Sequence, residues 1–500
     1  MGVIQQIKNF LIRSKYVMTT QDLVNITDHP KIAVTEGEYQ RIQSNLVYYQ
    51  SIFNDVEYLN TDGELKKRKL NHLPIARTAA KKIASLVFNE QAEIKVTDKV
   101  ADEFINSTLK NDRFNKNFER YLESCLALGG MAMRPYVDND KIRVAFIQAP
   151  VFLPLQYNTQ DVSSAAIVIK TVKKVGDKTF YYTLIEIHEW KNQNDYVITN
   201  ELYKTDNSSE VGRRVPLEEL YGDLKDKVNV TEVTRPLFTY LKPPGMNNKD
   251  INSPLGLSIF DNAKTTIDFI NTTYDEFRWE VKMGQRRVAV PESLTALNVR
   301  TVDGDVVPSP RFESDQNVYI RMGGRDLDSS AIQDLTTPIR ADDYIKAINE
   351  GLALFEMQLG VSAGLFSFDG KSVKTATEIV SENSDTYQMR NSIVALVEQS
   401  LKELVISIFE LAAGTGLYKG SIPGMDDISI NLDDGVFTDR KAELDYWIKV
   451  VGAGFGTQAM AIQKVLNVTD EEAKKIQAEV NTGIAKAINK QRTDVDLYGE

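Results

Sequence analysis

The chain of 500 residues has little of the chemistry on which many enzymes and metalloproteins depend. It contains one cysteine and three histidines. A single cysteine excludes an internal disulfide, and Cys125 lies in the apolar segment YLESCLALGG, so we expect a small buried hydrophobic side chain. The histidines, His29, His72 and His188, are far apart, and none has a Cys or His neighbour at zinc-ligand spacing. The sequence supports neither a histidine-based metal site nor a Ser-His-Asp triad, and we expect no cofactor.

Long apolar runs are also missing. No stretch reaches the roughly 18 consecutive apolar residues of a membrane-spanning helix, and the N-terminus has no apolar core followed by a small-residue cleavage site. Gln6 stands where a myristoylation signal requires Ser or Thr. A formal net charge of −11 argues against broad electrostatic attraction to nucleic acid or an anionic membrane. We expect no secretory signal, no lipid anchor and no membrane partner. If a nucleic acid is a partner, the protein must avoid binding it tightly.

The residues that are present are typical of a folded protein. Hydrophobic residues make up 42% of the chain, and its length implies several structural units. Apolar spacing predicts helices over residues 1–24, 37–60, 74–88 and 99–128. From about Ile142 to Leu241 the period changes to two, in segments such as KIRVAFIQ and FYYTLIEIHEW, which predicts an antiparallel meander of hairpins. The predicted fold class is therefore α+β.

Two narrow apolar seams follow a proline-containing loop at residues 242–254. The first lies on a helix expected to begin at Pro254, behind a Ser253 N-cap, and to end at Gly284. Its apolar residues recur at alternating spacings of 3 and 4: Phe260, Ala263, Ile267, Ile270, Tyr274, Phe277 and Val281. The second seam comprises Ala341, Ile345, Ile348, Leu352, Phe355 and Leu359. Residues 285–340 between them show strand patterns. We predict a hairpin of two long helices with a small α/β tip.

The second seam leads into a loop and a mostly helical C-terminal region. The Gly- and Ser-containing loop lies at residues 363–374, and a capped helix is expected to run from Thr375 to Leu411. Residues 427–432 predict a strand, residues 440–452 a helix and residues 457–490 two further helices.

Two glycine motifs approach nucleotide-binding fingerprints without matching them. In GLFSFDGKS, residues 364–372, five residues and not four separate Gly364 from Gly370, and the loop follows a helix where a P-loop follows a strand. Gly452, Gly454 and Gly456 form GxGxG, not GxGxxG. A nucleotide-dependent enzyme that uses residues 364–372 is therefore disfavoured, and it is kept as one alternative.

Three carboxylates recur every seven residues on the first seamed helix: Asp261, Asp268 and Asp275. They predict one acidic stripe beside the apolar seam. A solvated helix face is the commoner explanation for such a stripe. The alternative is a surface past which a polyanion must slide without sticking.

The order of these parts resembles the portal proteins of tailed bacteriophages, and most closely those of long-tailed phages that infect Gram-positive bacteria. The most specific strings are residues 253–279, which include SPLGLSIFDNAKTTIDFINTTYDEF, and residues 374–392, which include TATEIVSENSDTYQMRNS. Neither string is a catalytic signature. The resemblance covers nearly the whole chain and implies a structural protein, not an enzyme.

The resemblance implies a portal fold with a wing, a two-helix stem, a small α/β clip and a helical crown. The wing would comprise residues 1–245 and 375–440, the stem helices 246–284 and 341–362, the clip 285–340, the tunnel loop 363–374 and the crown 441–500. In the tunnel loop, Ser367, Asp369, Lys371 and Lys374 are the candidates to face DNA, although loop lysines are also commonly just solvated. The acidic stripe would line the channel. The expected stem-packing residues are Phe260, Ile267, Ile270, Tyr274, Phe277, Ile348, Leu352 and Phe355, and narrow seams of this kind suit packing between neighbours in a ring.

The resemblance also implies partners and a location. The family forms a homo-oligomeric ring, usually of twelve subunits, assembled in the host cytoplasm and placed at one capsid vertex of the virion. Double-stranded DNA would pass through it during packaging and ejection. Protein partners would be the terminase large subunit, a head-completion or adaptor protein, and the major capsid and scaffold proteins. A monomeric capsid-associated adaptor with the same helical hairpin is the second alternative.

Overall fold

The fold is known from a computed structural model, which describes most of the chain. The described residues are 22–32, 34–59, 63–88, 92–158, 161–192, 195–222, 224–231, 233–286, 288–291, 298–302, 305–309, 319–322, 333–334, 336–366, 384–432, 440–466, 468 and 473–482. Both helices and strands are present, as an α+β fold requires. The helix expected within residues 1–24 falls almost wholly outside the described residues, and β1 (Asp22–Leu23) occupies its end.

Helices of the N-terminal third form one side of a broad body. They are α2 (Glu36–Tyr49), α3 (Ile75–Val87), α4 (Lys99–Asn111) and α5 (Phe114–Leu128). The helix predicted at 74–88 is thus confirmed, whereas the one predicted at 37–60 ends at Tyr49. The single helix expected over 99–128 is two helices, because Arg113 adopts a left-handed conformation with φ 52° and the Asp112 carboxylate accepts a hydrogen bond from the Val144 amide at 2.9 Å.

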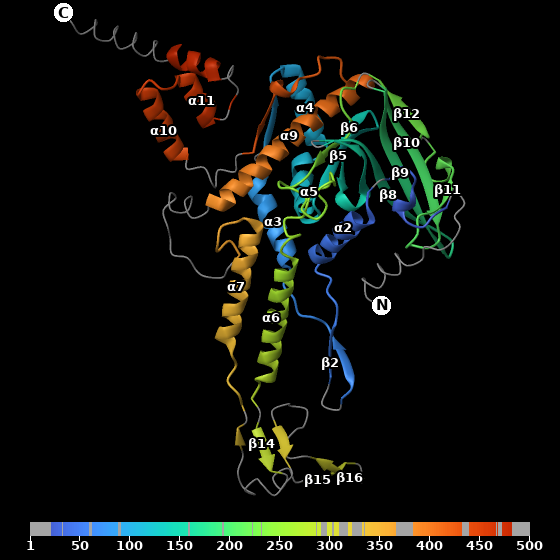
Figure 1. Cartoon of the computed structure of the whole chain (residues 1–500), viewed down its shortest axis with the longest axis vertical. Coiled ribbons are helices and arrows are strands. Elements are labelled where there is room, and N and C mark those ends of the chain that lie inside the picture. The colour runs from blue at the N-terminus through green and yellow to red at the C-terminus, as the bar shows by residue number, and fades with distance from the viewer. Residues whose placement is uncertain are drawn as a thin grey trace, which may run out of the picture.

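A twisted antiparallel sheet forms the other side of the body (Figure 1). Its strands lie in the order β1-β11-β10-β9-β8-β7, and β12 pairs with β10. The long strands β8 (Val162–Val175), β9 (Lys178–Asn192) and β10 (Asp195–Thr205) are the predicted meander of hairpins. The shorter strands are β7 (Phe152–Tyr157), β11 (Gly212–Val215) and β12 (Lys227–Val230).

Smaller sheets pack with these helices and form one main core with them. Strands β13 (Thr239–Leu241), β5 (Met131–Asp138) and β6 (Lys141–Gln148) form one sheet, and β19 (Ile428–Asn431) pairs with β4 (Glu93–Val96). The long helix α9 (Ser384–Gly414) crosses the body against them. The expected start of this helix at Thr375 lies outside the described residues. Short 3-10 turns occur at Ile26–Asp28, Ala149–Val151, Leu217–Glu219 and Met425–Asp427.

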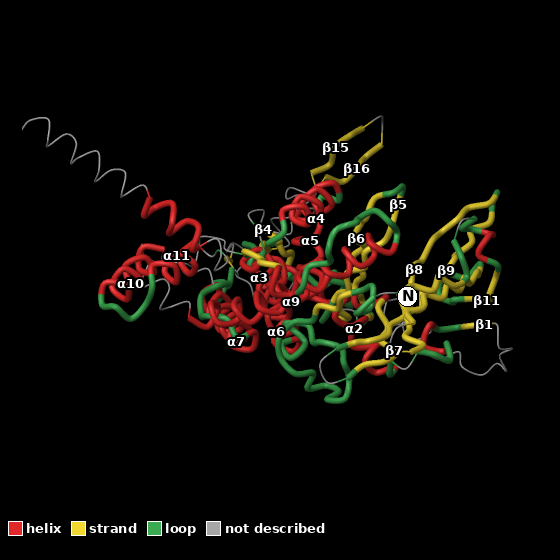
Figure 2. The backbone as a smooth tube through the Cα atoms, turned by 90° about the horizontal axis from the view of Figure 1, so that it is seen from above, coloured by secondary structure: helices red, strands yellow, loops and turns green. Residues whose placement is uncertain are grey.

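A stalk of two antiparallel helices leaves the body and ends in a small β tip (Figure 1). The stalk helices are α6 (Lys264–Met283) and α7 (Ala341–Leu359). In the tip, β14 (Val288–Pro291) pairs parallel with β17 (Tyr319–Met322) and antiparallel with β18 (Gln333–Asp334), while β15 (Asn298–Val302) and β16 (Asp305–Ser309) form a hairpin. Seen from above, α7, α6 and α2 lie in that order across the molecule (Figure 2). The predicted helical hairpin with a small tip is present.

The first stalk helix is shorter than predicted, because it begins at Lys264 and not at Pro254. Residues 254–263 run across the end of α5 with their backbone amides already bonded elsewhere. The Ile259 amide donates to the Leu126 carbonyl at 3.0 Å, and a Cβ on Gly256 would lie only 2.5 Å from the Gly129 carbonyl oxygen. Such close backbone packing fixes the segment outside a helix. Ser253 does not cap the helix; its hydroxyl donates to Glu38 at 2.7 Å.

The C-terminal region contains two further labelled helices, α10 (Arg440–Gly452) and α11 (Gln458–Leu466). Residues 473–482 are also helical. They lie beside the body at the end of the molecule opposite the tip (Figure 1). The helices predicted at 440–452 and within 457–490 are therefore confirmed where the structure describes them.

Candidate functional site

The two stalk helices pack tightly against each other along their upper halves. A Cβ on Gly351 would meet Ile270 Cγ1 at 2.7 Å, so the helices approach closely there. The Thr266 hydroxyl donates to Gln358 at 2.8 Å, and lower down Phe277 stacks on Tyr344 with ring centroids 5.5 Å apart. At the lower end Arg340 pairs with Glu280 at 2.9 Å. These contacts define a helical hairpin closed by its own side chains.

All eight residues expected to pack the stalk lie in or against the main core of the same chain. Tyr274 and Phe277 are partly buried and pack against the core. The other six are buried in it: Phe260, Ile267, Ile270, Ile348, Leu352 and Phe355. Phe260 precedes α6 and does not lie on it. These eight residues therefore pack within one chain, whereas packing of the exposed seam residues Val281 and Ile345 between neighbouring copies stays a prediction. The seams close the hairpin and insert its upper end into the body.

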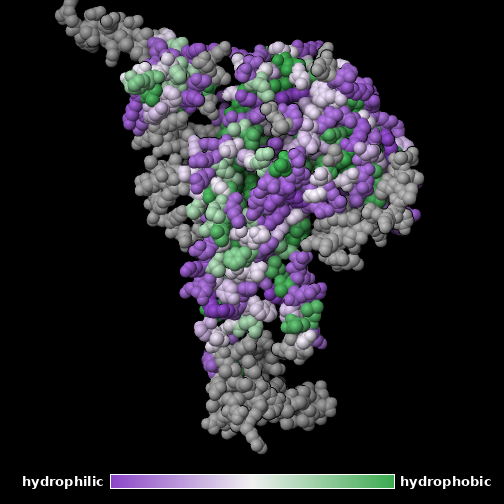
Figure 3. All heavy atoms as spheres, viewed as in Figure 1, coloured by the Kyte–Doolittle hydropathy of each residue, from purple (hydrophilic) through white to green (hydrophobic). Residues whose placement is uncertain are grey.

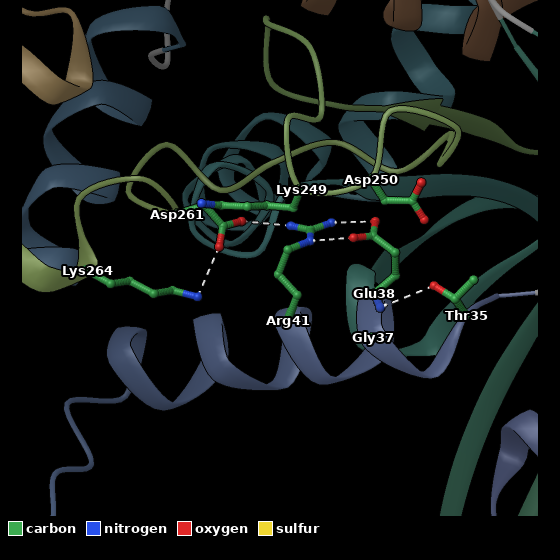
Figure 4. Close-up of a pocket in the computed structure, with 8 residues that line it drawn as sticks. All are labelled: Thr35, Gly37, Glu38, Arg41, Lys249, Asp250, Asp261 and Lys264. Atoms are coloured by element: carbon green, nitrogen blue, oxygen red, sulfur yellow. Dashed lines mark hydrogen bonds and ion pairs between the residues drawn. The ribbon is translucent and has the colours of Figure 1, made fainter.

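Asp261 lies at the junction of stalk and body, inside a buried network of charges (Figure 4). Its carboxylate accepts hydrogen bonds from Arg41 Nη1 at 2.7 Å and from Asn45 Nδ2 at 2.9 Å, and Lys264 Nζ lies 3.0 Å away. Arg41 also donates to Glu38 through Nε at 2.8 Å. Burial raises the pKa of Asp261, but the charges of Lys264 and Arg41 and the hydrogen bond from Asn45 outweigh it, so the pKa is lowered.

This junction is lined by groups that neutralise one another. Glu38 and Asp261 carry two negative charges, and Arg41 and Lys264 carry two positive ones. The remaining lining charges, Lys249 and Asp250, also cancel. The pocket at this junction therefore has no net charge with which to attract an ionic ligand. The arrangement holds α2 to the start of α6.

The other two carboxylates also bind the N-terminal part of the chain. Asp268 accepts a hydrogen bond from the Tyr48 hydroxyl of α2 at 2.8 Å. Asp275 is held by both terminal nitrogens of Arg68, at 2.7 and 2.6 Å, and by the Asn71 amide at 3.0 Å. Burial raises the pKa of Asp275, but the bonds from Arg68 and Asn71 outweigh it and lower the pKa to about 2.

The expected acidic channel stripe is therefore corrected. Asp261 precedes α6, and Asp261 and Asp275 are buried in ion pairs; Asp268 is exposed but faces Tyr48. A buried carboxylate with a bound cation cannot present free negative charge to a passing polyanion. The seven-residue spacing is real, and its role is to fasten the stalk to residues 36–75.

A buried glutamate anchors the loop that follows the stalk. Glu356 projects from α7, and its two carboxylate oxygens accept hydrogen bonds from the backbone amides of Gly364, at 2.7 Å, and Phe366. The α7 helix ends at Gly360 in a left-handed conformation with φ 71°. Two reciprocal hydrogen bonds, of 2.9 and 3.2 Å, then join Ser362 to Thr386 of α9. These two hydrogen bonds hold Ser362 and Thr386 close together, although they are 24 residues apart in the sequence.

The DNA-facing candidates of this segment, Ser367, Asp369, Lys371 and Lys374, lie outside the described residues. The residues that anchor its base were not found from the sequence. Glu356 did leave a signal, because it is a lone charge three and four residues from Leu359 and Leu352 of the apolar seam. Arg41 and Arg68 left none, since their partners are more than 200 residues away.

Two observations limit other kinds of site. Within the described ranges, no group of His, Cys, Asp and Glu is placed to hold a metal ion. No helix in that part of the chain has the length and apolarity needed to cross a bilayer. His188, far from the stalk, is buried and bonded to Glu186 and to the Tyr196 hydroxyl, the latter at 2.8 Å, which is a packing role.

Comparison with known protein families places the chain in one of them. The family model described as phage portal protein, SPP1 Gp6-like, matches residues 28–485. The matched range includes the body, the stalk, the tip and most of the C-terminal helices. No curated protein matches the chain.

Proposed function

Because the chain belongs to the phage portal protein family, we propose that it forms a ring of twelve copies that encloses the channel for double-stranded DNA. The family is one of structural proteins that assemble as oligomers at the capsid portal vertex. The observation that carries the proposal is the two-helix stalk between a broad body and a small β tip. A narrow stalk with a wide body at one end has the wedge shape that closes into a ring around an axis.

This arrangement supports an assignment of the family's domains to parts of the chain. The stalk helices α6 and α7 would be the stem, the tip within residues 285–340 the clip, and the body the wing, with residues 441–500 as crown. The clip would dock the terminase large subunit during packaging and a head-completion protein afterwards. The major capsid and scaffold proteins would contact the ring from outside. The anchored loop would be the tunnel loop, with its base held by Glu356.

The mass of the purified protein tests the ring. We expect a species near twelve times the chain mass of 56.3 kDa by light scattering or native mass spectrometry. A purely monomeric species at micromolar concentration would contradict the proposal and support the monomeric adaptor. Lys371-dependent binding or hydrolysis of ATP would instead support the enzyme alternative, and we expect neither.

The loop is tested separately by the amount of DNA that mutant particles contain. Shortening Ser367–Lys371 should leave rings and procapsids intact and lower the packaged DNA, because a lumenal loop touches the moving duplex. Glu356→Gln should act in the same direction more weakly, since an amide keeps the shape but has only one acceptor oxygen for the two amides. Full heads at wild-type yield after the shortening would show that the loop makes no productive contact with DNA.

A further inference from the structure

The β2–β3 hairpin is an amphipathic ribbon that projects from the body beside the stalk (Figure 1). Strand β2 (Val56–Leu59) pairs with β3 (Leu65–Arg68), and the directly opposed residues are Val56 with Arg68, Glu57 with Lys67, Tyr58 with Lys66 and Leu59 with Leu65. Because side chains alternate between the faces of a strand, the Tyr58 and Arg68 pairs share one face and the Glu57 and Leu59 pairs share the other.

The first of these faces is bound to the chain's own stalk. Arg68 pairs with Asp275 of α6, and its guanidinium lies 5.0 Å from the centroid of the Trp279 ring. Tyr58 packs on the same ring, with centroids 6.0 Å apart. The hairpin is therefore held against the lower half of α6, on the side of α6 opposite α7.

The second face turns two leucines to the surface. Leu59 is 68% exposed and Leu65 is 60% exposed, and they lie directly across the ribbon from each other. Beside them Lys67 pairs with Glu57 at 2.6 Å. Hydrophobic residues are visible on the surface in this region (Figure 3). An apolar pair rimmed by charges on a two-stranded ribbon, which is only marginally stable alone, is typical of a surface that a partner covers.

The start of α7, on the side of α6 away from the hairpin, has an exposed apolar residue at the same level. Three contacts of neighbouring α6 residues show that the hairpin and the start of α7 lie at the same height along the stalk. Trp279 packs on Tyr58 of the hairpin, whereas Glu280 pairs with Arg340 and Phe277 stacks on Tyr344. Next to these residues, Ile345 of α7 is 49% exposed. Ile339 instead packs on the end of α6, where a Cβ on Gly284 would lie 2.6 Å from its Cγ1. Consecutive helical residues are about 100° apart, so Ile345 points sideways from the Tyr344 face that meets α6.

We propose that the outer face of this hairpin docks on the start of α7 in a neighbouring copy of the chain. The inference rests on the proposed ring, in which rotation about the axis brings the hairpin side of one subunit beside the α7 side of the next at the same height. Leu59 and Leu65 would cover Ile345. The exposed Lys69 would face Asp342 and Asp343, which are exposed in the first turn of α7.

The proposed contact uses two different surfaces, so it is heterologous. A heterologous contact adds copies in one direction and closes into a ring when the rotation permits, whereas a self-complementary contact stops at a dimer. One hairpin per subunit would thus connect every stem to the next. The partner is a second copy because the complementary apolar and acidic surface is present on this chain at the matching level.

Cross-linking tests the contact directly. Cys125 is buried, so cysteines introduced at the surface react without it. The Leu59→Cys and Ile345→Cys double variant, treated with a short bis-maleimide, should give a ladder of covalent oligomers up to the full ring. Leu59→Cys alone should give monomers, and so should Leu59→Cys with Val172→Cys, an exposed position on the distant strand β8. Rings that give no ladder with the first pair, or dimers with Leu59→Cys alone, would overturn the proposal.

A second experiment separates this inference from the proposed ring. In Leu59→Asp with Leu65→Asp, we expect the ring fraction at a fixed concentration to fall about tenfold or more, because burial of two leucines is lost. The exposed Val172→Asp is the matched control and should assemble normally. Wild-type protein that never forms rings would refute the proposed function itself. Rings of the double variant at wild-type yield would refute only the hairpin contact.

Discussion

The upper and lower halves of the stalk carry the same apolar spacing but differ in what covers it. In the upper half, Ile267, Ile270 and Phe355 lie in the main core beneath the body helices. In the lower half, Val281 and Ile345 continue the two seams and are exposed. The repeat therefore predicts which face of a helix is apolar, while burial depends on what lies opposite. Ile345 is half exposed within the described chain, and the proposed neighbour would cover it.

Aspartate substitution in the two halves should separate them most strongly. Ile267→Asp buries an unpaired carboxylate and removes core contacts, so we expect the free energy of opening α6 to fall by about 3–5 kcal/mol. Ile345→Asp, on the same kind of seam but exposed in the single chain, should change it by less than about 0.5 kcal/mol in the unassembled protein. Native-state hydrogen exchange of the α6 amides measures both. Equal losses in the two variants would contradict the difference between the halves.

The ion pair at the middle of the stalk should give the next largest effect. Arg68→Met leaves the buried Asp275 carboxylate with hydrogen bonds only from Asn71, which should cost about 2–3 kcal/mol of stability in the lower half of α6. Arg286→Met is the matched control, since its pair with Asp334 is exposed and should be worth less than about 1 kcal/mol. The same hydrogen-exchange measurement applies. A loss no larger than the control's would show that the pair does not hold the stalk.

Acid should weaken the same link. The pKa of Asp275 is about 2 in the folded chain, below its unfolded value of about 3.9. A lowered pKa stabilises the fold above the unfolded pKa, and this stability, about 2 kcal/mol, is lost as the pH falls from about 5 to 2. Asp275→Asn should lack this part of the pH dependence, which unfolding of both proteins across that range would measure. Parallel curves would contradict the assignment.

The close approach of the two helices should give the smallest effect. A Cβ in Gly351→Ala would lie 2.7 Å from Ile270 Cγ1 and must displace it. Overpacking costs about 1–3 kcal/mol, and the higher helix propensity of alanine recovers about 1 kcal/mol, so we expect a net loss of about 1 kcal/mol. Gly37→Ala in α2 meets nothing within 4 Å and should stabilise instead. The melting temperatures of the two variants should therefore shift in opposite directions.

Much of the fold could be predicted from the sequence because its patterns are local. The alternation in FYYTLIEIHEW and the 3-4 spacing of the seams are set by the geometry of one strand or one helix, and both are observed. The start of α6 could not be predicted in this way. Pro254 and Ser253 form a good helix start, but contacts with Leu126 and Glu38 use the groups that a helix would need.

The role of the acidic stripe could not be predicted for a similar reason. A seven-residue repeat of aspartates shows that the carboxylates share a face, but not whether that face meets water, DNA or protein. The partners Arg41, Tyr48 and Arg68 lie more than 200 residues earlier and have no pattern that links them to the stripe. Pairing at that distance depends on the tertiary fold alone.

The fastening of the stalk by Arg41, Tyr48 and Arg68 has a consequence for biosynthesis. Arg68 precedes Asp275 by 207 residues. At a translation rate of about 5–20 residues per second, roughly 10–40 s pass between the synthesis of the two partners. During that time the hairpin and α2 are present without the helix that holds them. We therefore expect the N-terminal helices and the hairpin to reach their final packing late, and slow translation before Asp275 would prolong the exposure of Tyr58 and Arg68 on the ribosome.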